Sequence, residues 1–218
     1  MCSQEGAFTK RDLLACIATV GMLALFLLFL CLPPTGTKAR AGRINCVSNL
    51  KQAGLGFRMW SNDHGERFPW EVPANEGGTK EFAALPYAAV HFVLVSNEFN
   101  SPKILTCPDD ANRSRTADWQ APLHGSLSYF AGISAHETIP SAILSGDRNV
   151  STNAAMTAGL VTADKSENVR WTRDIHEHAG NIAFVDGSVS QTTSEMLRRA
   201  IEANIAALTN QSIRLSIP

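Results

Sequence analysis

The segment from Leu13 to Leu32 reads LLACIATVGMLALFLLFLCL and contains no charged residue. As an α-helix with a rise of about 1.5 Å per residue, its 20 residues extend about 30 Å, the thickness of the hydrocarbon core of a bilayer. No later segment of the chain has an uninterrupted apolar run of this length. The segment therefore predicts a helix that tethers the rest of the chain to a membrane or directs its export.

Three kinds of N-terminal signal contain such a helix. A cleaved secretory signal would use Ala39-Arg40-Ala41 as its cleavage site, but the apolar run exceeds the usual 7–15 residues and Lys38 lies beside the site. A lipoprotein signal would place its cysteine after the run, whereas Cys16 lies near the start. A retained membrane anchor fits the length best, and cleavage after Ala41 stays open as an alternative.

The residues before the run resemble the processing site of type IV prepilins. Residues 6–14 read GAFTKRDLL, close to the usual pattern of Gly, Phe-Thr, two apolar residues, Glu and Leu-Leu. The resemblance implies that a prepilin peptidase cuts between Ala7 and Phe8 and methylates the new amine. It also implies that Asp12, in the place of the usual glutamate, aligns neighbouring subunits. The sequence departs from the pattern at Ala7, Asp12 and the basic pair Lys10-Arg11.

A second resemblance involves segments far from the N-terminus. His176 is separated by nine residues from Asp186-Gly187, and this H-x9-D-G pattern is similar to the C-terminal signature of a group of bacterial pilin-like proteins. Residues 46–52 (CVSNLKQ) and 105–109 (LTCPD) resemble two further segments of that group. The resemblance implies an α+β, pilin-like fold, in which a long N-terminal helix packs on a small antiparallel sheet with a C-terminal hairpin and helix.

The domain organisation follows from the anchor and from the prolines after it. Pro33-Pro34 interrupts the helix, because proline lacks a backbone N–H donor. The expected parts are a leader over 1–7, a transmembrane anchor over 8–34, an extracytoplasmic continuation helix over 35–64, and a globular α+β domain over 65–218.

The continuation helix is predicted from about Lys38 to Asn62. Apolar residues recur at three- and four-residue steps and predict one buried face: Ile44, Val47, Leu50, Gly54 and Phe57. Polar residues are expected on the opposite face: Arg43, Asn45, Asn49, Gln52 and Ser61. Gly54 and Gly56 weaken a helix by about 1 kcal/mol each relative to alanine, which suggests a close packing neighbour there.

The middle of the chain gives weaker patterns. Residues 68–81 are rich in Pro, Gly and Trp and predict a loop, and residues 85–97 favour a helix. Strands are predicted over 103–110 and 127–133. The polar segment 145–149 is predicted to be a turn, with the lining of a surface site as the alternative.

The C-terminal third gives the clearest local pattern. Asp186-Gly187 between two apolar runs predicts a hairpin with a type I′ turn, which needs positive φ at both residues. Thr192 and Glu195 predict a capping box that opens a helix with a buried face. That face is Leu197, Ile201, Ile205 and Leu208. A final strand is predicted over 213–217.

Charge and cysteine content limit the functional classes. The net charge of −1 lacks the basic balance of a nucleic-acid-binding protein, so no nucleic-acid partner is expected. Cys46 and Cys107 are the cysteines of the exported part, and in an oxidising compartment they are candidates for a disulfide. Closing that loop of about 60 residues would contribute about 3–4 kcal/mol, with two buried free thiols as the alternative.

The sequence contains candidate ligands for metal ions but no motif for catalysis. His176 and His178 would present two imidazoles on one face of an extended segment and are the candidate metal ligands. Calcium, bound by pseudopilins, would need six to eight oxygens. The acidic candidates for it are Asp109, Asp110, Asp147 and Asp186. No nucleophile motif or phosphate-binding glycine loop is present, so we expect no enzymatic activity and no obligatory cofactor.

The resemblance implies a structural subunit of a type II secretion or type IV pilus-related assembly. It would be a single-pass protein of the bacterial cell membrane, with a cytoplasmic N-terminus and the globular domain outside. Its expected partners are the membrane, the prepilin peptidase, and other copies or other pilin-like subunits. Three alternatives are a solitary anchored binding module, a secreted protein cleaved after Ala41, and an anchored metal-dependent enzyme.

Overall fold

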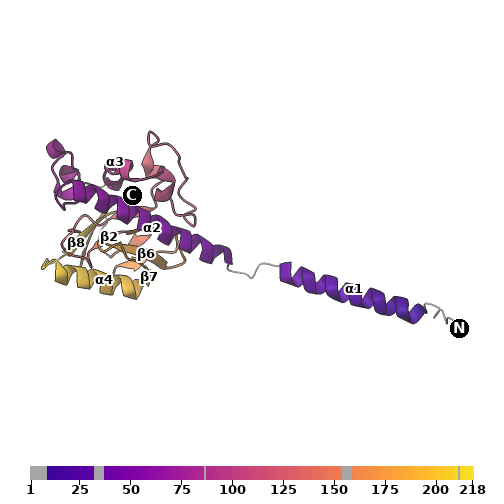
Figure 1. The fold of residues 1–218 in the computed structure, drawn as a ribbon. Helices are drawn as coiled ribbons and strands as arrows, with labels where there is room; N and C mark the ends of the chain where they lie inside the picture. Colours follow the sequence, from indigo (N-terminus) through magenta and orange to yellow (C-terminus); the bar gives the residue numbers. More distant parts are fainter. Residues whose placement is uncertain (1–8, 32–36, 86, 154–158, 211) are drawn as a thin grey trace. The chain divides into compact units, whose positions relative to one another are not determined.

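The computed structural model describes residues 9–31, 37–85, 87–153, 159–210 and 212–218 (Figure 1). The chain divides into two compact units, of which the first ends at Lys38 and the second begins at Ala39. The first contains one helix, and the second contains the remaining helices and the sheets.

Helix α1 spans Lys10–Cys31 and matches the predicted anchor. Its large apolar side chains have exposed fractions between 52% and 75%. Within the described residues, the segment Lys10–Leu30 is the one helix whose length and composition suit a membrane crossing.

Helix α2 spans Thr37–Asp63, which confirms the predicted continuation helix. Its buried face overlaps the predicted one, because Leu50, Gly54 and Phe57 are buried as expected. The face is shifted, since Ile44 is 57% exposed, whereas Asn49 and Ser61, which were expected on the polar face, are buried. The reason lies in two specific contacts. Cys46 forms a disulfide, and Asn49 Nδ2 donates a hydrogen bond of 3.1 Å to the carbonyl of Thr106, so both must face the domain.

The buried face of α2 includes a glycine that a larger residue could not replace without movement. A Cβ atom at Gly56 would lie 2.2 Å from Cε1 of Phe99, far inside van der Waals contact. At Gly54 the same atom would make an ordinary 3.7 Å contact with Leu144. The predicted close neighbour therefore exists at Gly56, where α2 meets the segment around Phe99.

A six-stranded antiparallel sheet forms the centre of the second unit, in the order β4-β8-β1-β2-β6-β7. Its strands are β1 Tyr129–Ala131, β2 Ile143–Asp147, β4 Leu160–Asp164, β6 Ala179–Phe184, β7 Val189–Thr193 and β8 Ser212–Ser216. A separate two-stranded sheet pairs β3 Val150–Ser151 with β5 Arg170–Trp171. The mixture of helices with an antiparallel sheet agrees with the expected α+β class.

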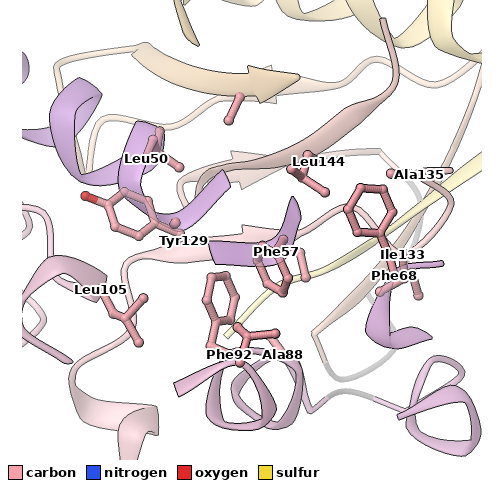
Figure 2. Close-up of a cluster of buried hydrophobic side chains, with 14 of the residues drawn as sticks. Leu50, Phe57, Phe68, Ala88, Phe92, Leu105, Tyr129, Ile133, Ala135 and Leu144 are labelled. Atoms are coloured by element: carbon pink, nitrogen blue, oxygen red, sulfur yellow. The ribbon is translucent and has the colours of Figure 1, made fainter. Parts of the chain in front are cut away.

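Helices cover both faces of the large sheet, with α2 on one side and α4 on the other (Figure 1). Because side chains alternate along a strand, each strand contributes to two cores. The core on the α2 side includes Leu50, Phe57, Phe92, Tyr129 and Leu144 (Figure 2). The core on the α4 side includes Phe130, Ile143, Ile182, Leu197 and Ile201. The fold is thus helix, sheet and helix in three layers.

The segment between α2 and β1 consists of short helical turns. Helix α3, Ala88–Leu94, lies inside the predicted helix and is shorter than predicted. The predicted loop over 68–81 contains three 3₁₀ helices: η1 Pro69–Glu71, η2 Ala74–Glu76 and η3 Lys80–Phe82. Three more follow: η4 Ser96–Glu98, η5 Pro102–Leu105 and η6 Leu123–Gly125.

The strand predicted over 103–110 is wrong, because η5 occupies its first half. Pro102 supplies the first helical residue, and the Oγ of Ser101 accepts a hydrogen bond from the N–H of Lys103. The Leu105 carbonyl accepts a hydrogen bond from the Ser128 N–H beside β1, so the segment lies against the sheet without joining its ladder.

The hairpin β6–β7 confirms the strongest local prediction, although its turn differs. Gly187 has a φ of +85°, while Asp186 is not among the residues with positive φ, so the turn is not type I′. The Phe184 N–H donates to the Ser188 carbonyl at 2.9 Å, which encloses a three-residue loop ending in a left-handed glycine.

Helix α4, Ser194–Ala207, begins one residue later than predicted. Its N-cap is Thr193, whose Oγ1 accepts a hydrogen bond from the Met196 N–H. Thr192 is buried instead, and its Oγ1 accepts a hydrogen bond from Nε1 of Trp171. The predicted buried face of α4 is confirmed, as is the final strand β8.

Candidate functional site

Charged side chains gather in the interior of the second unit, between α2 and one end of the sheet. We call this group the polar cluster and define it as Arg43, Asp109, Asp110, Asp147, Arg148 and His176. Its members come from α2, from the segment after η5, from the end of β2 and from the segment before β6. Charged groups are seldom buried without partners, so each contact within the cluster is informative.

The disulfide between Cys46 and Cys107 joins α2 to the segment that carries two of the cluster's acids. The two cysteines are 61 residues apart in sequence, and their Cα atoms are 5.1 Å apart. Both residues are buried. This confirms the predicted bridge. The disulfide fixes Cys107 against α2 and so restrains Asp109, which lies two residues further along the chain.

His176 lies at the centre of the polar cluster, with its side chain only 1% exposed. Its Nδ1 is 3.0 Å from Oδ2 of Asp109, and its Nε2 is 3.5 Å from Oδ2 of Asp147. Nε2 also lies 3.6 Å from Sγ of Cys107. Burial lowers the pKa of His176, against the opposing effect of the Asp109 carboxylate.

An unusual backbone segment holds His176 in place. His176, Glu177 and His178 have φ values of 56°, 51° and 66°, so three successive non-glycine residues are left-handed. The Nδ2 of Asn149 lies 2.8 Å from the Ile175 carbonyl and 3.0 and 3.1 Å from the carbonyls at 172 and 179. Arg43 adds a 2.8 Å hydrogen bond to the His176 carbonyl.

This backbone separates the two histidines named as candidate metal ligands. An extended segment would place their imidazoles on one face, but His176 is buried whereas His178 is exposed. Residues 176–178 are not extended, because three successive left-handed residues turn the chain. His176 faces the disulfide and two carboxylates instead.

Asp110 and Arg148 form a buried ion pair with two hydrogen bonds of 2.7 Å each. The carboxylate also accepts hydrogen bonds from the hydroxyl of Ser128 and the N–H of Asn112. Burial raises the pKa of Asp110, but Arg148 and Ser128 outweigh it and hold the pKa below its ordinary value. Both carboxylate oxygens are thus engaged by this chain.

Asp147 ends strand β2 and is fully buried. Its Oδ2 accepts hydrogen bonds of 2.7 and 2.8 Å from the backbone N–H and the Nδ2 of Asn181. Its Oδ1 has no hydrogen-bond partner among the described residues. Burial raises the pKa of Asp147 to about 7. The turn predicted over 145–149 is wrong, since residues 145–147 belong to a central strand.

The structure brings together three of the four acids proposed as calcium ligands. Asp109, Asp110 and Asp147 belong to the polar cluster, but Asp186 lies in the exposed hairpin turn, where its Oδ1 accepts a hydrogen bond from the Ser188 N–H. The two halves of the H-x9-D-G pattern accordingly have separate positions: His176 is in the cluster, and Asp186-Gly187 shapes the β6–β7 turn.

The N-terminal candidates lie in the first unit. Ala7 and Phe8 fall outside the described residues. Asp12 Oδ2 accepts hydrogen bonds from the Thr9 N–H at 2.9 Å and from Thr9 Oγ1 at 2.7 Å. The Asp12 N–H is 3.4 Å from Thr9 Oγ1, which completes a reciprocal cap at the start of α1.

Several surface hollows border polar side chains of the second unit, and two of them are relevant to the candidate functions. One of about 240 Å³ lies at the outer side of the cluster and is lined by Arg43, Asp109, Arg173, Asp174, His176 and Glu177. The other, of about 380 Å³, lies elsewhere and has three basic residues on its lining, Arg67, Lys80 and Arg214. The second is large enough for a small organic ligand.

Several residues of the site were assigned to other places by the sequence. Arg43 was expected on a solvent face, Arg148 and Asn149 in a turn with a surface site as the alternative, and Asn181 in a hairpin strand. The sequence signal for this site was the run of polar residues around Asp147. A surface turn accounts for the same run equally well. Comparisons with protein-family models, curated proteins and solved structures find no significant match to this chain.

Proposed function

We propose that this protein is a membrane-anchored, pilin-like or pseudopilin-like structural subunit of a type II secretion or type IV pilus-related assembly. The observation that carries the proposal is α1, a 22-residue helix whose apolar side chains are uncovered and which belongs to a separate compact unit. Leaving such a surface in water would be unfavourable by about 25 cal/mol for each Å² of apolar area. Lipid or neighbouring helices would remove that cost.

The proposed mechanism is assembly through the anchor, with the globular domain displayed outside the membrane. After cleavage before Phe8, the new amine would lie close to the start of α1, and Asp12 of a neighbouring copy would pair with it. Such a pair is stronger in a low-dielectric environment than in water. In this structure Thr9 donates two hydrogen bonds to the Asp12 carboxylate. Pairing of Asp12 with a neighbouring copy would therefore replace these two hydrogen bonds.

Crosslinking through natural cysteines of the anchor tests assembly directly. A Cys2→Ser chain retains Cys16 and Cys31, and oxidation in isolated membranes should give a ladder of covalent multimers. Because each chain carries two anchor thiols, it can link neighbours on two sides. The matched control, Cys16→Ser with Cys31→Ser, should give no ladder. A persistent monomer in the first chain would contradict the proposal.

Processing is tested separately by intact mass and N-terminal sequencing of the membrane-extracted protein. A mature chain that begins with methylated Phe8 supports prepilin-type processing, whereas a chain that begins after Ala41 supports secretion. A chain that retains its leader has no Phe8 amine and could not form the proposed Asp12 pair.

A second candidate, an anchored extracytoplasmic binding module, is favoured by the basic 380 Å³ hollow. Lys80 and Arg214 line it, and their side chains have no hydrogen-bond partner among the described residues. A persistent monomer in the crosslinking experiment, together with binding of an anionic ligand that Arg214→Gln abolishes, would favour this function over assembly.

A further inference from the structure

The disulfide and His176 place three metal-binding groups at one buried point, and the Asp147 carboxylate lies beside His176. The ligand atoms of Cys46, Cys107 and His176 all lie within 4.8 Å of one another. Nε2 of His176 is 3.6 Å from Sγ of Cys107 and 3.5 Å from the Asp147 carboxylate. In the structure the two sulfurs are bonded to each other, so the group is closed to metal in this state.

We propose that the dithiol form of this protein binds a single zinc ion through Cys46, Cys107, His176 and Asp147. Zinc takes four ligands in a tetrahedron, and thiolate, imidazole and carboxylate are its usual ligands in proteins. The proposal is independent of assembly through α1, because every proposed ligand lies in the second unit.

The spacing of the groups agrees with a tetrahedral site. Zinc–ligand bonds of about 2.0–2.3 Å place neighbouring ligand atoms about 3.3–3.8 Å apart. The distance from His176 Nε2 to Cys107 Sγ already has this size, and Nε2 lies 3.5 Å from Oδ2 of Asp147, which is bonded to the same carbon as the unpartnered Oδ1. On zinc binding the two sulfurs must separate and the Asp147 carboxylate must approach them.

The surroundings of His176 also agree with a metal ligand. Metal-bound histidines usually donate their second ring N–H to a carboxylate or a carbonyl, which fixes the ring. Here Nδ1 lies 3.0 Å from Asp109, so Nε2 is directed toward the sulfurs. The backbone held by Arg43 and Asn149 fixes the position of the ring.

Asp147 provides the second independent observation that points to a ligand. It is fully buried, and its Oδ1 has no partner within the described part of the chain. A buried carboxylate oxygen without a partner is costly, and coordination of a cation would supply the missing interaction. Its Oδ2 is already fixed by Asn181, so the free oxygen is held in one orientation.

The two states are related by a balanced exchange. The zinc-bound dithiolate reacts with a disulfide oxidant and two protons to give zinc ion, the Cys46–Cys107 disulfide and two oxidant-derived thiols. In the reverse reaction a dithiol reductant gives two electrons to the Cys46–Cys107 bond and becomes a disulfide itself, and two protons are released as zinc binds the two thiolates. Because every protein disulfide forms from thiols, the dithiol form that would bind zinc precedes the bridged form in each molecule.

Cobalt(II) is the probe, since thiolate-bound cobalt absorbs strongly whereas zinc is spectroscopically silent. The full-length chain in detergent, with Cys2, Cys16 and Cys31 replaced by serine, is reduced with a phosphine under anaerobic conditions and titrated with cobalt(II). We expect one equivalent to bind with thiolate-to-cobalt charge-transfer absorption, and one equivalent of zinc(II) to abolish it. The unreduced chain should show no such absorption.

Single substitutions distinguish the residues that bind or orient the metal from those that do not. His176→Asn should reduce cobalt affinity at least tenfold, and Asp109→Asn should reduce it by about 10–100-fold, as loss of a ring-orienting partner does. His178→Asn, two residues away and exposed, is the matched control and should bind as the parent does.

Circular dichroism at each step keeps the test decisive if the reduced chain unfolds without metal. In that case zinc should restore the native spectrum of the parent but not of His176→Asn. Absence of both charge-transfer absorption and restored structure would overturn the proposal. Equal cobalt binding by the parent and His176→Asn would also overturn it.

Discussion

Arg148→Met should be one of the most damaging substitutions outside the two hydrophobic cores. Arg148 makes two 2.7 Å hydrogen bonds to Asp110, and the exposed fractions of the two side chains are 12% and 0%. Methionine keeps much of the side-chain volume but leaves the Asp110 charge buried without its cation. Breaking a buried pair in this way costs about 3–5 kcal/mol, whereas an exposed pair contributes about 0–1 kcal/mol.

Urea unfolding of the full-length chain in detergent, with the disulfide closed, would measure this loss near pH 7.5. The informative companion is Arg148→Met combined with Asp110→Asn, which removes the stranded charge and keeps a hydrogen-bonding side chain for Ser128. We expect the double variant to regain most of the lost stability. The reasoning that Arg148 compensates the buried charge of Asp110 would be refuted by either of two results. One is a loss of unfolding free energy below about 1 kcal/mol in the single variant, and the other is no recovery of that free energy in the double variant.

Three other predictions follow from single contacts. Gly56→Ala should destabilise the domain by about 1–3 kcal/mol through overpacking against Phe99, measured as a lower urea midpoint; an unchanged midpoint would contradict the tight packing. Asp147 has a folded pKa of about 7 against an ordinary 3.8, so its protonated form favours folding at low pH and about 3 kcal/mol is lost as pH rises from 4 to 7. Asp147→Asn should flatten that pH dependence; a parent whose stability rises with pH across this window while the variant's does not would reverse the assigned sign. Replacing Cys46 and Cys107 together by serine should lower the free energy of unfolding by about 2–5 kcal/mol, measured by thermal unfolding. A smaller loss would show that the disulfide is not needed for the stability of the domain.

The elements that sequence periodicity predicted correctly are those stabilised by local patterns. The apolar run of α1 and the alternation in β8 need no knowledge of distant residues. The Asp186-Gly187 pair likewise marks a hairpin from its own backbone preferences, although the loop length, and with it the turn type, depends on how the two strands pair.

The errors came where distant contacts override local pattern. The rotation of α2 is set by Cys46 and Asn49, whose partners lie about 60 residues further along the chain. A count of apolar positions gives Ile44 to the core because it cannot weigh those partners. In the same way Pro102 and the Ser101 cap convert an apolar segment into a 3₁₀ turn beside the sheet.

The polar cluster was harder to predict because its members are spread over more than a hundred residues. Cys46 and Cys107 were predicted to pair, but the approach of His176 depends on three left-handed residues that no composition rule anticipates. Asp147 reads as part of a polar turn until the pairing of β2 with β6 is known. Only the fold shows that these side chains share one buried place.

The position of β8 has a consequence for how the protein is made. Residues 212–216 form a strand between β4 and β1, so the sheet closes only after a segment far beyond β1 in the sequence has been synthesised. Until then β4 and β1 present unpaired backbone edges, which readily pair with other chains. A chain that lacks residues 212–216 should therefore be a substrate for chaperones and proteases.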